Sequence, residues 1–343
     1  METVRLGRTG LVVNKIGFGV LPIQRVGMEE AKRILHRAVD AGVDFFDTAR
    51  GYTDSEEKLG AALEPALRKQ LVLATKAKSA DGEALMQSLH TSLKTLRTEY
   101  VDILQVHNPK QMPAPDDGSG RYEALLEARR AGKIRFIGIS AHSVDVAIQA
   151  ARSALYYTVQ FPFSYLSSEG DIKLTKLCAE KDVGFIAMKA LSGGLLNDIF
   201  TARTWMAQHA NVVPIWGIEK ESELDQLFEA AKQPETLSAE QQARIEKDRK
   251  ELSGEFCRGC GYCLPCPADI NISQIARLSF LVNRSPTVRF TTPEWQAQIS
   301  RVDDCQNCGH CSAHCPYGMD TPSLLKKNRE WYRNFMETQQ GVK

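Results

Sequence analysis

The sequence lacks the features that would place the protein in or across a membrane. None of the apolar runs in this chain of 343 residues is long enough to span a bilayer. The N-terminal residues also lack the basic-then-apolar pattern of an export signal. We therefore expect a cytoplasmic protein without a membrane span.

Charge of one predominant sign is missing as well. The chain carries 43 basic and 42 acidic residues, which leaves a formal net charge of +1. A balance this close to neutral gives no reason to expect a nucleic acid or an anionic membrane surface as partner. The function has to be sought in local motifs instead.

Cysteine is scarce along most of the chain and abundant only near its C-terminus. Of the nine cysteines, Cys178 stands alone, and the others form two runs of four: Cys257, Cys260, Cys263 and Cys266, then Cys305, Cys308, Cys311 and Cys315. The second run has the spacing C-x2-C-x2-C-x3-C-P of bacterial two-cluster ferredoxins, and the first run departs from it by one residue. Thiolates at such short repeats can converge on a small iron–sulfur cube.

The two runs predict two [4Fe–4S] clusters, with the last cysteine of each run crossing to the other cluster. One cluster is expected on Cys257, Cys260, Cys263 and Cys315, and the other on Cys305, Cys308, Cys311 and Cys266. Disulfides fit less well because they need an oxidising compartment and the chain shows no export signal. Zinc fits less well because it prefers two C-x2-C pairs separated by a longer loop. Cys178 lies in an apolar helical pattern, where we expect a small buried hydrophobe.

Short apolar segments alternate with amphipathic, helix-like segments before the cysteine runs. The strand-like segments are residues 15–21, 43–47, 71–75, 102–106, 134–139, 157–160, 184–188 and 212–216. Strands that are apolar along their whole length suit a parallel sheet covered by helices, and eight such βα units predict a (β/α)8 TIM barrel of the α/β class. One helix is expected over residues 56–67, and a hairpin over residues 4–13 is expected to close the barrel floor.

The domain organisation follows from these patterns. We predict the barrel over residues 1–232 and a charged helical linker over 233–254. A small, mainly helical, ferredoxin-like iron–sulfur domain is expected over 255–343, where both cysteine runs lie.

Polar residues fall at or just past the C-terminal ends of three consecutive predicted strands. Asp47 ends the second strand with Tyr52 shortly after it, Lys76 ends the third, and His107 ends the fourth. Taken singly, each has an ordinary alternative, such as a helix cap, a solvated lysine or a core histidine. Together they predict an active site, because barrel enzymes assemble their catalytic groups at this rim.

These four residues resemble the Asp-Tyr-Lys-His tetrad of the aldo-keto reductases. Phe46-Asp-Thr-Ala, followed by Tyr52 and then Glu57-Lys-Leu-Gly, looks like that family's signature in order and spacing. With its cysteine runs, the whole chain resembles the bacterial branch of the family that carries a C-terminal two-cluster ferredoxin-type domain. The resemblance implies an oxidoreductase that interconverts a small carbonyl substrate and its alcohol with NADPH or NADH.

The chemistry of the four groups suits that reaction. Reducing a carbonyl needs a hydride on carbon and a proton on oxygen, so we predict Tyr52 as general acid in reduction and general base in oxidation. The ammonium of Lys76 is expected to lower the tyrosine pKa from its usual value near ~10, with Asp47 orienting the lysine. His107 is expected to donate a hydrogen bond to the substrate oxygen.

The resemblance also assigns residues to the nicotinamide cofactor. They are Ser140, Gln160, Met188, Lys189, Gly193, Gly194 and Lys220. Ser140 and Gln160 match carboxamide-binding positions, and the two glycines would let the backbone approach a pyrophosphate. The segment after the eighth strand retains Lys220 but is mostly acidic, which leaves NADPH and NADH both open.

Joining the two halves leaves three hypotheses open, because clusters pass single electrons whereas a hydride carries two. In the first, the clusters exchange electrons with an external carrier such as a ferredoxin-like partner while the barrel turns over its substrate. In the second, a nicotinamide-dependent reductase carries structural or regulatory clusters. In the third, the chain is a non-enzymatic electron-transfer module, which the intact tetrad argues against.

Overall fold

The computed structural model of the chain describes residues 2–193, 196–252, 257, 263–282, 287–315 and 318–340. It divides the chain into two compact units, Met1–Ile245 and Glu246–Lys343, which are described separately below. Among the described helices, none combines the length and apolar character needed to cross a bilayer.

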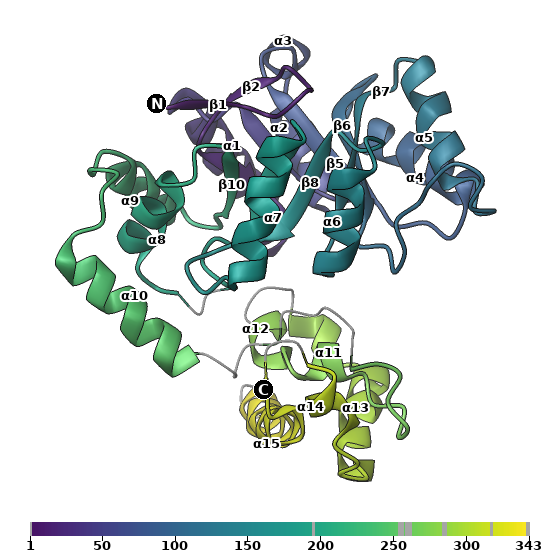
Figure 1. The fold of residues 1–343 in the computed structure, drawn as a ribbon, viewed down its shortest axis with the longest axis vertical. Helices are drawn as coiled ribbons and strands as arrows, with labels where there is room; N and C mark the ends of the chain where they lie inside the picture. Colours follow the sequence, from purple (N-terminus) through teal and green to yellow (C-terminus); the bar gives the residue numbers. More distant parts are fainter. Residues whose placement is uncertain are drawn as a thin grey trace. The chain divides into compact units, whose positions relative to one another are not determined.

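The first unit is built on a closed barrel of parallel strands, which confirms the predicted fold (Figure 1). In the described residues the strands follow one another around the barrel in chain order: β3 (Gly17–Gly19), β4 (Phe45–Asp47), β5 (Val72–Ala77), β6 (Val101–His107), β7 (Ile134–Ser140), β8 (Thr158–Pro162), β9 (Gly184–Met188) and β10 (Val212–Gly217). Pairing of β10 with β3 closes the ring, so all carboxyl ends of the strands meet at one rim.

Helices in the first unit follow the barrel strands along the chain and cover the outside of the barrel (Figure 1). They are η1 (Leu21–Arg25), α1 (Met28–Asp40), α2 (Ser55–Ala62), α3 (Pro65–Arg68), α4 (Gly82–Thr95), α5 (Arg121–Arg130), α6 (Val144–Arg152), α7 (Glu169–Glu180), α8 (Ile199–Ala207) and α9 (Glu221–Ala231). The single helix expected over residues 56–67 is wrong. Pro65 has no amide hydrogen to continue α2, and it begins α3 in the first turn instead.

The N-terminal residues close the floor of the barrel, as the sequence predicted. β1 (Thr3–Arg5) and β2 (Val12–Asn14) pair antiparallel as a hairpin. Its apolar side chains join the cluster inside the barrel, which contains Val4, Leu6, Leu11, Val13, Phe45, Ala74, Ile103, Ile186, Val213 and Ile215. A filled interior leaves the C-terminal rim as the place for chemistry.

The second unit is helical among its described residues. Its elements are α11 (Ile272–Ile275), α12 (Leu278–Val282), η2 (Thr287–Phe290), α13 (Pro293–Ser300), η3 (Arg301–Asp304), α14 (His310–Ala313) and α15 (Thr321–Gln340), and α10 (Ala239–Leu252) runs across the boundary between the units. A small core of apolar residues from these helices also takes in cysteines of both runs. The cysteines are thus built into the packing of this unit.

Candidate active site and cluster site

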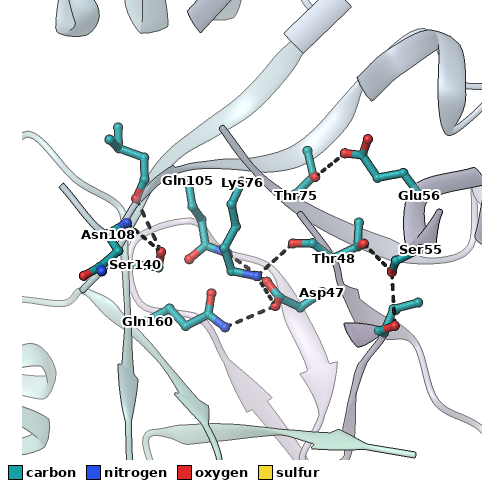
Figure 2. Close-up of polar contacts among 12 residues, drawn as sticks. Asp47, Thr48, Ser55, Glu56, Thr75, Lys76, Gln105, Asn108, Ser140 and Gln160 are labelled. Atoms are coloured by element: carbon teal, nitrogen blue, oxygen red, sulfur yellow. Dashed lines mark hydrogen bonds and ion pairs between the residues drawn. The ribbon is translucent and has the colours of Figure 1, made fainter. Parts of the chain in front are cut away.

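A buried ion pair lies at the C-terminal end of the first barrel strands. Asp47 is the last residue of β4, and Lys76 lies near the end of the neighbouring strand β5. Their side chains are 2% and 1% exposed and form a direct ion pair, and the Lys76 ammonium also donates to the carbonyl of Thr48 at 2.8 Å (Figure 2). The rim therefore presents a lysine fixed in place by its countercharge.

Two glutamines complete the hydrogen bonds to the Asp47 carboxylate. Gln160 Nε2 donates to Oδ1 at 3.1 Å, and Gln105 Nε2 donates to Oδ2 at 2.9 Å (Figure 2). Burial raises the pKa of Asp47 above its usual value, and Lys76 and both amides offset this rise only in part. Burial lowers the pKa of Lys76, but Asp47 and Tyr52 outweigh burial and leave that pKa above its usual value. The lysine is therefore charged at neutral pH.

Tyr52 lies above this pair in the turn between β4 and α2. Its backbone amide donates to the carbonyl of Ala49 at 3.0 Å, and its own carbonyl accepts from the amide of Ser55 at 2.8 Å. The Lys76 Nζ is 5.1 Å from the centre of the tyrosine ring, and the His107 ring meets that ring edge-on at 5.8 Å between centroids. The structure thus brings together all four residues that the sequence proposed as catalytic.

Two opposing effects set the pKa of Tyr52, and the expected effect of Lys76 is the smaller one. The Lys76 ammonium does lower the pKa of Tyr52, but burial of the phenol is the larger effect and raises that pKa above its usual value. Tyr52 therefore carries its proton at neutral pH. A protonated phenol beside a cation is suited to donating a proton during carbonyl reduction.

His107 is the last residue of β6 and is neutral at physiological pH. Burial, followed by the nearby Lys76 and Lys78, lowers the pKa of His107 to about 3. A neutral imidazole still has one N–H to donate. The ring is half-buried at the rim, where it can donate to a substrate oxygen without carrying a charge.

The positions expected to hold the nicotinamide carboxamide lie beside His107. Strand register places His107 next to Ser140 on β7, and Ser140 next to Gln160 on β8. The Oε1 atom of Gln160 is buried and accepts no hydrogen bond in the described structure. An amide N–H of a bound carboxamide would satisfy this acceptor, so these residues fit the group.

The remaining cofactor positions follow the later strands. Met188 is the half-buried last residue of β9, and the turn after it contains left-handed backbone at Lys189 and Gly193. Gly194 lies outside the described residues. Lys220 is exposed and precedes α9, and no described contact joins it to the tetrad.

Thiols from both cysteine runs line one cavity of the second unit. Its lining includes Cys263, Cys266, Cys305, Cys308 and Cys311. The cavity holds about 390 Å³ outside the protein atoms, part of it open to solvent. All four cysteines expected on the second cluster, including the crossing Cys266, therefore line the same cavity, together with Cys263 of the first.

Local backbone geometry wraps the second run around this cavity. Asn307 and Gly309 both adopt left-handed conformations, and the short helix α14 follows directly. Such residues reverse the chain direction within a few positions, so the backbone turns twice between Cys305 and Cys311. Cys257 and Cys263 are buried and Cys315 is half-buried, but Cys260 lies outside the described residues.

Comparison with known protein families agrees with this geometry. A model described as "Aldo/keto reductase family" matches residues 15–204, more than half of the chain. The chain belongs to the aldo-keto reductase family. A second model, for a 4Fe-4S dicluster domain, matches residues 256–320. This aldo-keto reductase thus carries an appended iron–sulfur domain.

Individual relatives share the barrel. The aldo-keto reductase YhdN of Bacillus subtilis is 29% identical over 219 residues, covering 59% of this chain and 65% of that protein. The 6-dehydroglucose reductase of Novosphingobium aromaticivorans is 32% identical over 162 residues, covering 41% and 52%. The L-galactose dehydrogenase of Arabidopsis thaliana is 31% identical over 216 residues, covering 58% and 68%. The chain thus spans less than two thirds of the first two relatives.

A solved structure supports the fold. The thermostable aldo-keto reductase Tm1743 superposes with a TM-score of 0.61 at 24% identity, covering 72% of this chain and 100% of that one. At this identity the likeness concerns the fold alone. Together with the family match, it agrees with an oxidoreductase barrel.

The state of His107 predicts how the stability of this aldo-keto reductase depends on pH. The pKa of His107 is about 3 in the folded chain, whereas a solvated histidine has its usual pKa of about 6.5. Between these values the unfolded chain binds more protons, so the free energy of unfolding falls as the pH falls through that window. His107→Gln keeps a donor that does not titrate. Between pH 7 and pH 5, the free energy of unfolding of this variant should fall by about 2 kcal/mol less than that of the parent chain. Urea unfolding at both pH values measures the difference.

The matched control is His90→Gln, which changes an exposed histidine on α4. It is expected to leave the pH dependence of unfolding as in the parent chain. Equal acid sensitivity in His107→Gln and the parent chain would show that His107 titrates normally and is not held neutral by burial.

Proposed function

We propose that this chain interconverts small carbonyl compounds and their alcohols, with Tyr52 as the acid–base group and NADH or NADPH as the hydride partner. The observation that carries the proposal is the buried Asp47–Lys76 ion pair beneath the rings of Tyr52 and His107 at the barrel rim. The relatives include a 6-dehydroglucose reductase and an L-galactose dehydrogenase, which supports the same class of reaction.

Each residue has a distinct role in the proposal. Tyr52 donates its phenolic proton to the carbonyl oxygen as that oxygen gains negative charge. Lys76 stabilises the resulting phenolate because its ammonium is fixed close by, and Asp47 holds the ammonium in place. His107, neutral through burial, donates a hydrogen bond to the same substrate oxygen.

The nicotinamide, when bound, supplies the hydride. Ser140 and Gln160 are proposed to hold its carboxamide, and Met188 to pack against the ring through its thioether. Lys189, Gly193 and Gly194 are proposed to meet the pyrophosphate. Lys220 is the proposed contact for the end of the dinucleotide that lies away from the nicotinamide ring. Glu219 and Glu221 are its neighbours in the sequence.

The clusters are proposed to exchange electrons with an external carrier, for which a ferredoxin-like protein is the expected partner. Cys305, Cys308, Cys311 and Cys266 would hold one cluster, and Cys257, Cys260, Cys263 and Cys315 the other. The cavity lined by Cys266, Cys305, Cys308 and Cys311 supports grouping these four, and Cys263 of the other set lines it as well. Purely structural or regulatory clusters remain the second candidate, because the tetrad alone is enough for a nicotinamide-dependent reductase. A cytoplasmic location stays a prediction.

One anaerobic experiment tests both parts of the proposal. The cluster-loaded protein is mixed with NADH or NADPH and a panel of small aldehydes and ketones, and the nicotinamide and cluster absorbances are followed together. We expect nicotinamide oxidation that requires a carbonyl, because both hydride electrons pass to the carbonyl carbon. In a parallel mixture that contains a reduced ferredoxin-like carrier, we expect the clusters to be reduced as the carrier is oxidised. Turnover with unchanged clusters would favour the structural role, and nicotinamide binding without turnover of any carbonyl or alcohol would overturn the reductase.

A further inference from the structure

Gln105 is a polar side chain inside an otherwise apolar barrel strand. It lies two residues before His107 on β6, so both side chains point to the same face as the core residue Ile103. Gln105 is fully buried. Its Oε1 accepts no hydrogen bond in the described structure, so only its Nε2 is bonded. A buried amide costs free energy where it is not hydrogen-bonded, so the partner of Nε2 identifies the use of the residue.

That partner is the Asp47 carboxylate. The two oxygens of Asp47 are bonded differently: Oδ1 accepts from Lys76 and Gln160, and Oδ2 accepts from Gln105 at 2.9 Å (Figure 2). Strand register also places Gln105 next to Lys76 across β5 and β6. Gln105 thus contacts the carboxylate on the side that Lys76 leaves open.

The neighbouring strand leaves space for this arrangement. Gly138 on β7 is the register partner of Gln105, and a methyl group on it would lie 2.9 Å from Gln105 Cγ and 2.4 Å from Thr158 Oγ1. The Gln105 side chain therefore fits at this position because Gly138 has no Cβ atom. Thr158 lies in the same register layer, and its hydroxyl makes no hydrogen bond in the described structure.

We infer that Gln105 is a positioning residue of this site, which fixes the Asp47 carboxylate in the orientation that faces Lys76 next to Tyr52. The inference rests on the proposed function, because it assigns Gln105 a part in the same proton transfer. Gln105 acts through Asp47 and does not touch the reacting atoms. A hydrogen bond to a charged, buried group is among the stronger ones in proteins.

Removing the amide is expected to slow the reaction. Gln105→Leu should lower kcat for carbonyl reduction about 10- to 100-fold and leave KM for the nicotinamide nearly unchanged. Without the donor, Asp47 takes up a proton more readily. The pH below which activity is lost should therefore be higher for the variant than for the parent chain. Gln105→Met, which keeps the chain length, should behave alike and guards against a folding failure of the first variant.

The matched control is Thr158→Val, which removes a hydroxyl from the same layer without touching Asp47. It should leave both the rate and the pH profile unchanged. Gln105 would be shown only to fill space if Gln105→Leu lowers the rate without raising the pH at which activity falls in acid. The same conclusion would follow if Thr158→Val had an equal effect.

A second readout does not depend on activity. Infrared difference spectra show the protonated carboxyl of Asp47 as a band that is lost in Asp47→Asn, and its midpoint pH is compared between variants. A higher midpoint in Gln105→Leu supports the positioning role even if the parent chain turns over no carbonyl, in which case the proposed function fails alone. An unchanged midpoint overturns the inference whatever the activity.

Discussion

Tyr52→Phe is expected to lower kcat for carbonyl reduction by about 10²- to 10⁴-fold, the usual contribution of a positioned acid–base group. The change removes one hydroxyl and keeps the ring that packs against His107 and Lys76. Nicotinamide binding should be nearly unchanged, because the proposed cofactor contacts lie on β7, β8 and β9 and in the segments after β9 and β10. Initial rates over a range of carbonyl concentrations measure both quantities.

The control for this change is Tyr100→Phe. Tyr100 immediately precedes β6, at the opposite end of that strand from His107. Its substitution is expected to leave the rate as in the parent chain, and both variants should keep their full cluster absorbance. If Tyr52→Phe keeps the full rate, the phenol is not the proton donor, and the proposed mechanism must be abandoned.

Cys308→Ala is expected to remove one of two clusters, and with it about half of the bound iron and of the visible absorbance. Cys308 is exposed, so the substitution disturbs little packing and its effect reports on ligation. Iron and sulfide content after anaerobic reconstitution is the measurement. Cys178→Ala is the matched control, because Cys178 is buried in α7 with its thiol pKa raised to about 12 by burial, and it should keep all of the iron.

Paired substitutions then test which thiols share a cluster. Cys308→Ala combined with Cys266→Ala should lose no more iron than either change alone, because both thiols are assigned to one cluster. Cys308→Ala combined with Cys315→Ala should lose both clusters. The opposite pattern would show that the last cysteines of the runs do not cross, and an effect of Cys178→Ala would refute the ligand assignment itself.

The barrel could be predicted because its strands differ sharply from their surroundings. Segments such as Gly184–Met188 are uniformly apolar and lie between amphipathic helices, and the structure has strands at all eight predicted places. The break at Pro65 was missed because the flanking residues continue a helical pattern and only the missing amide hydrogen interrupts it. The cluster ligands were predicted from spacing alone, and the cavity lined by Cys266, Cys305, Cys308 and Cys311, with Cys263 beside them, supports that prediction for these four.

The site was predictable where a side chain ends a strand and not where its environment decides its chemistry. Asp47, Lys76 and His107 could be placed at one rim because strand ends mark that rim. The raised pKa of Tyr52 could not be predicted, because burial outweighs the effect of the nearby ammonium and burial is not visible in the sequence. Gln105 was missed although its signal was present, a polar residue on the inward-facing positions that also carry His107.

The closing strand pair of the barrel has a consequence for how the chain is made. Gly17 on β3 pairs with Ile215 on β10, so the ring cannot close until nearly all of the first unit has left the ribosome. Until then, the hairpin residues Leu6 and Val13 lack the walls that later bury them. Contacts this distant in sequence form slowly, and an open β3 edge beside an uncovered hairpin invites association with other nascent chains. We therefore expect chains that stall before β10 to require chaperones to remain unaggregated.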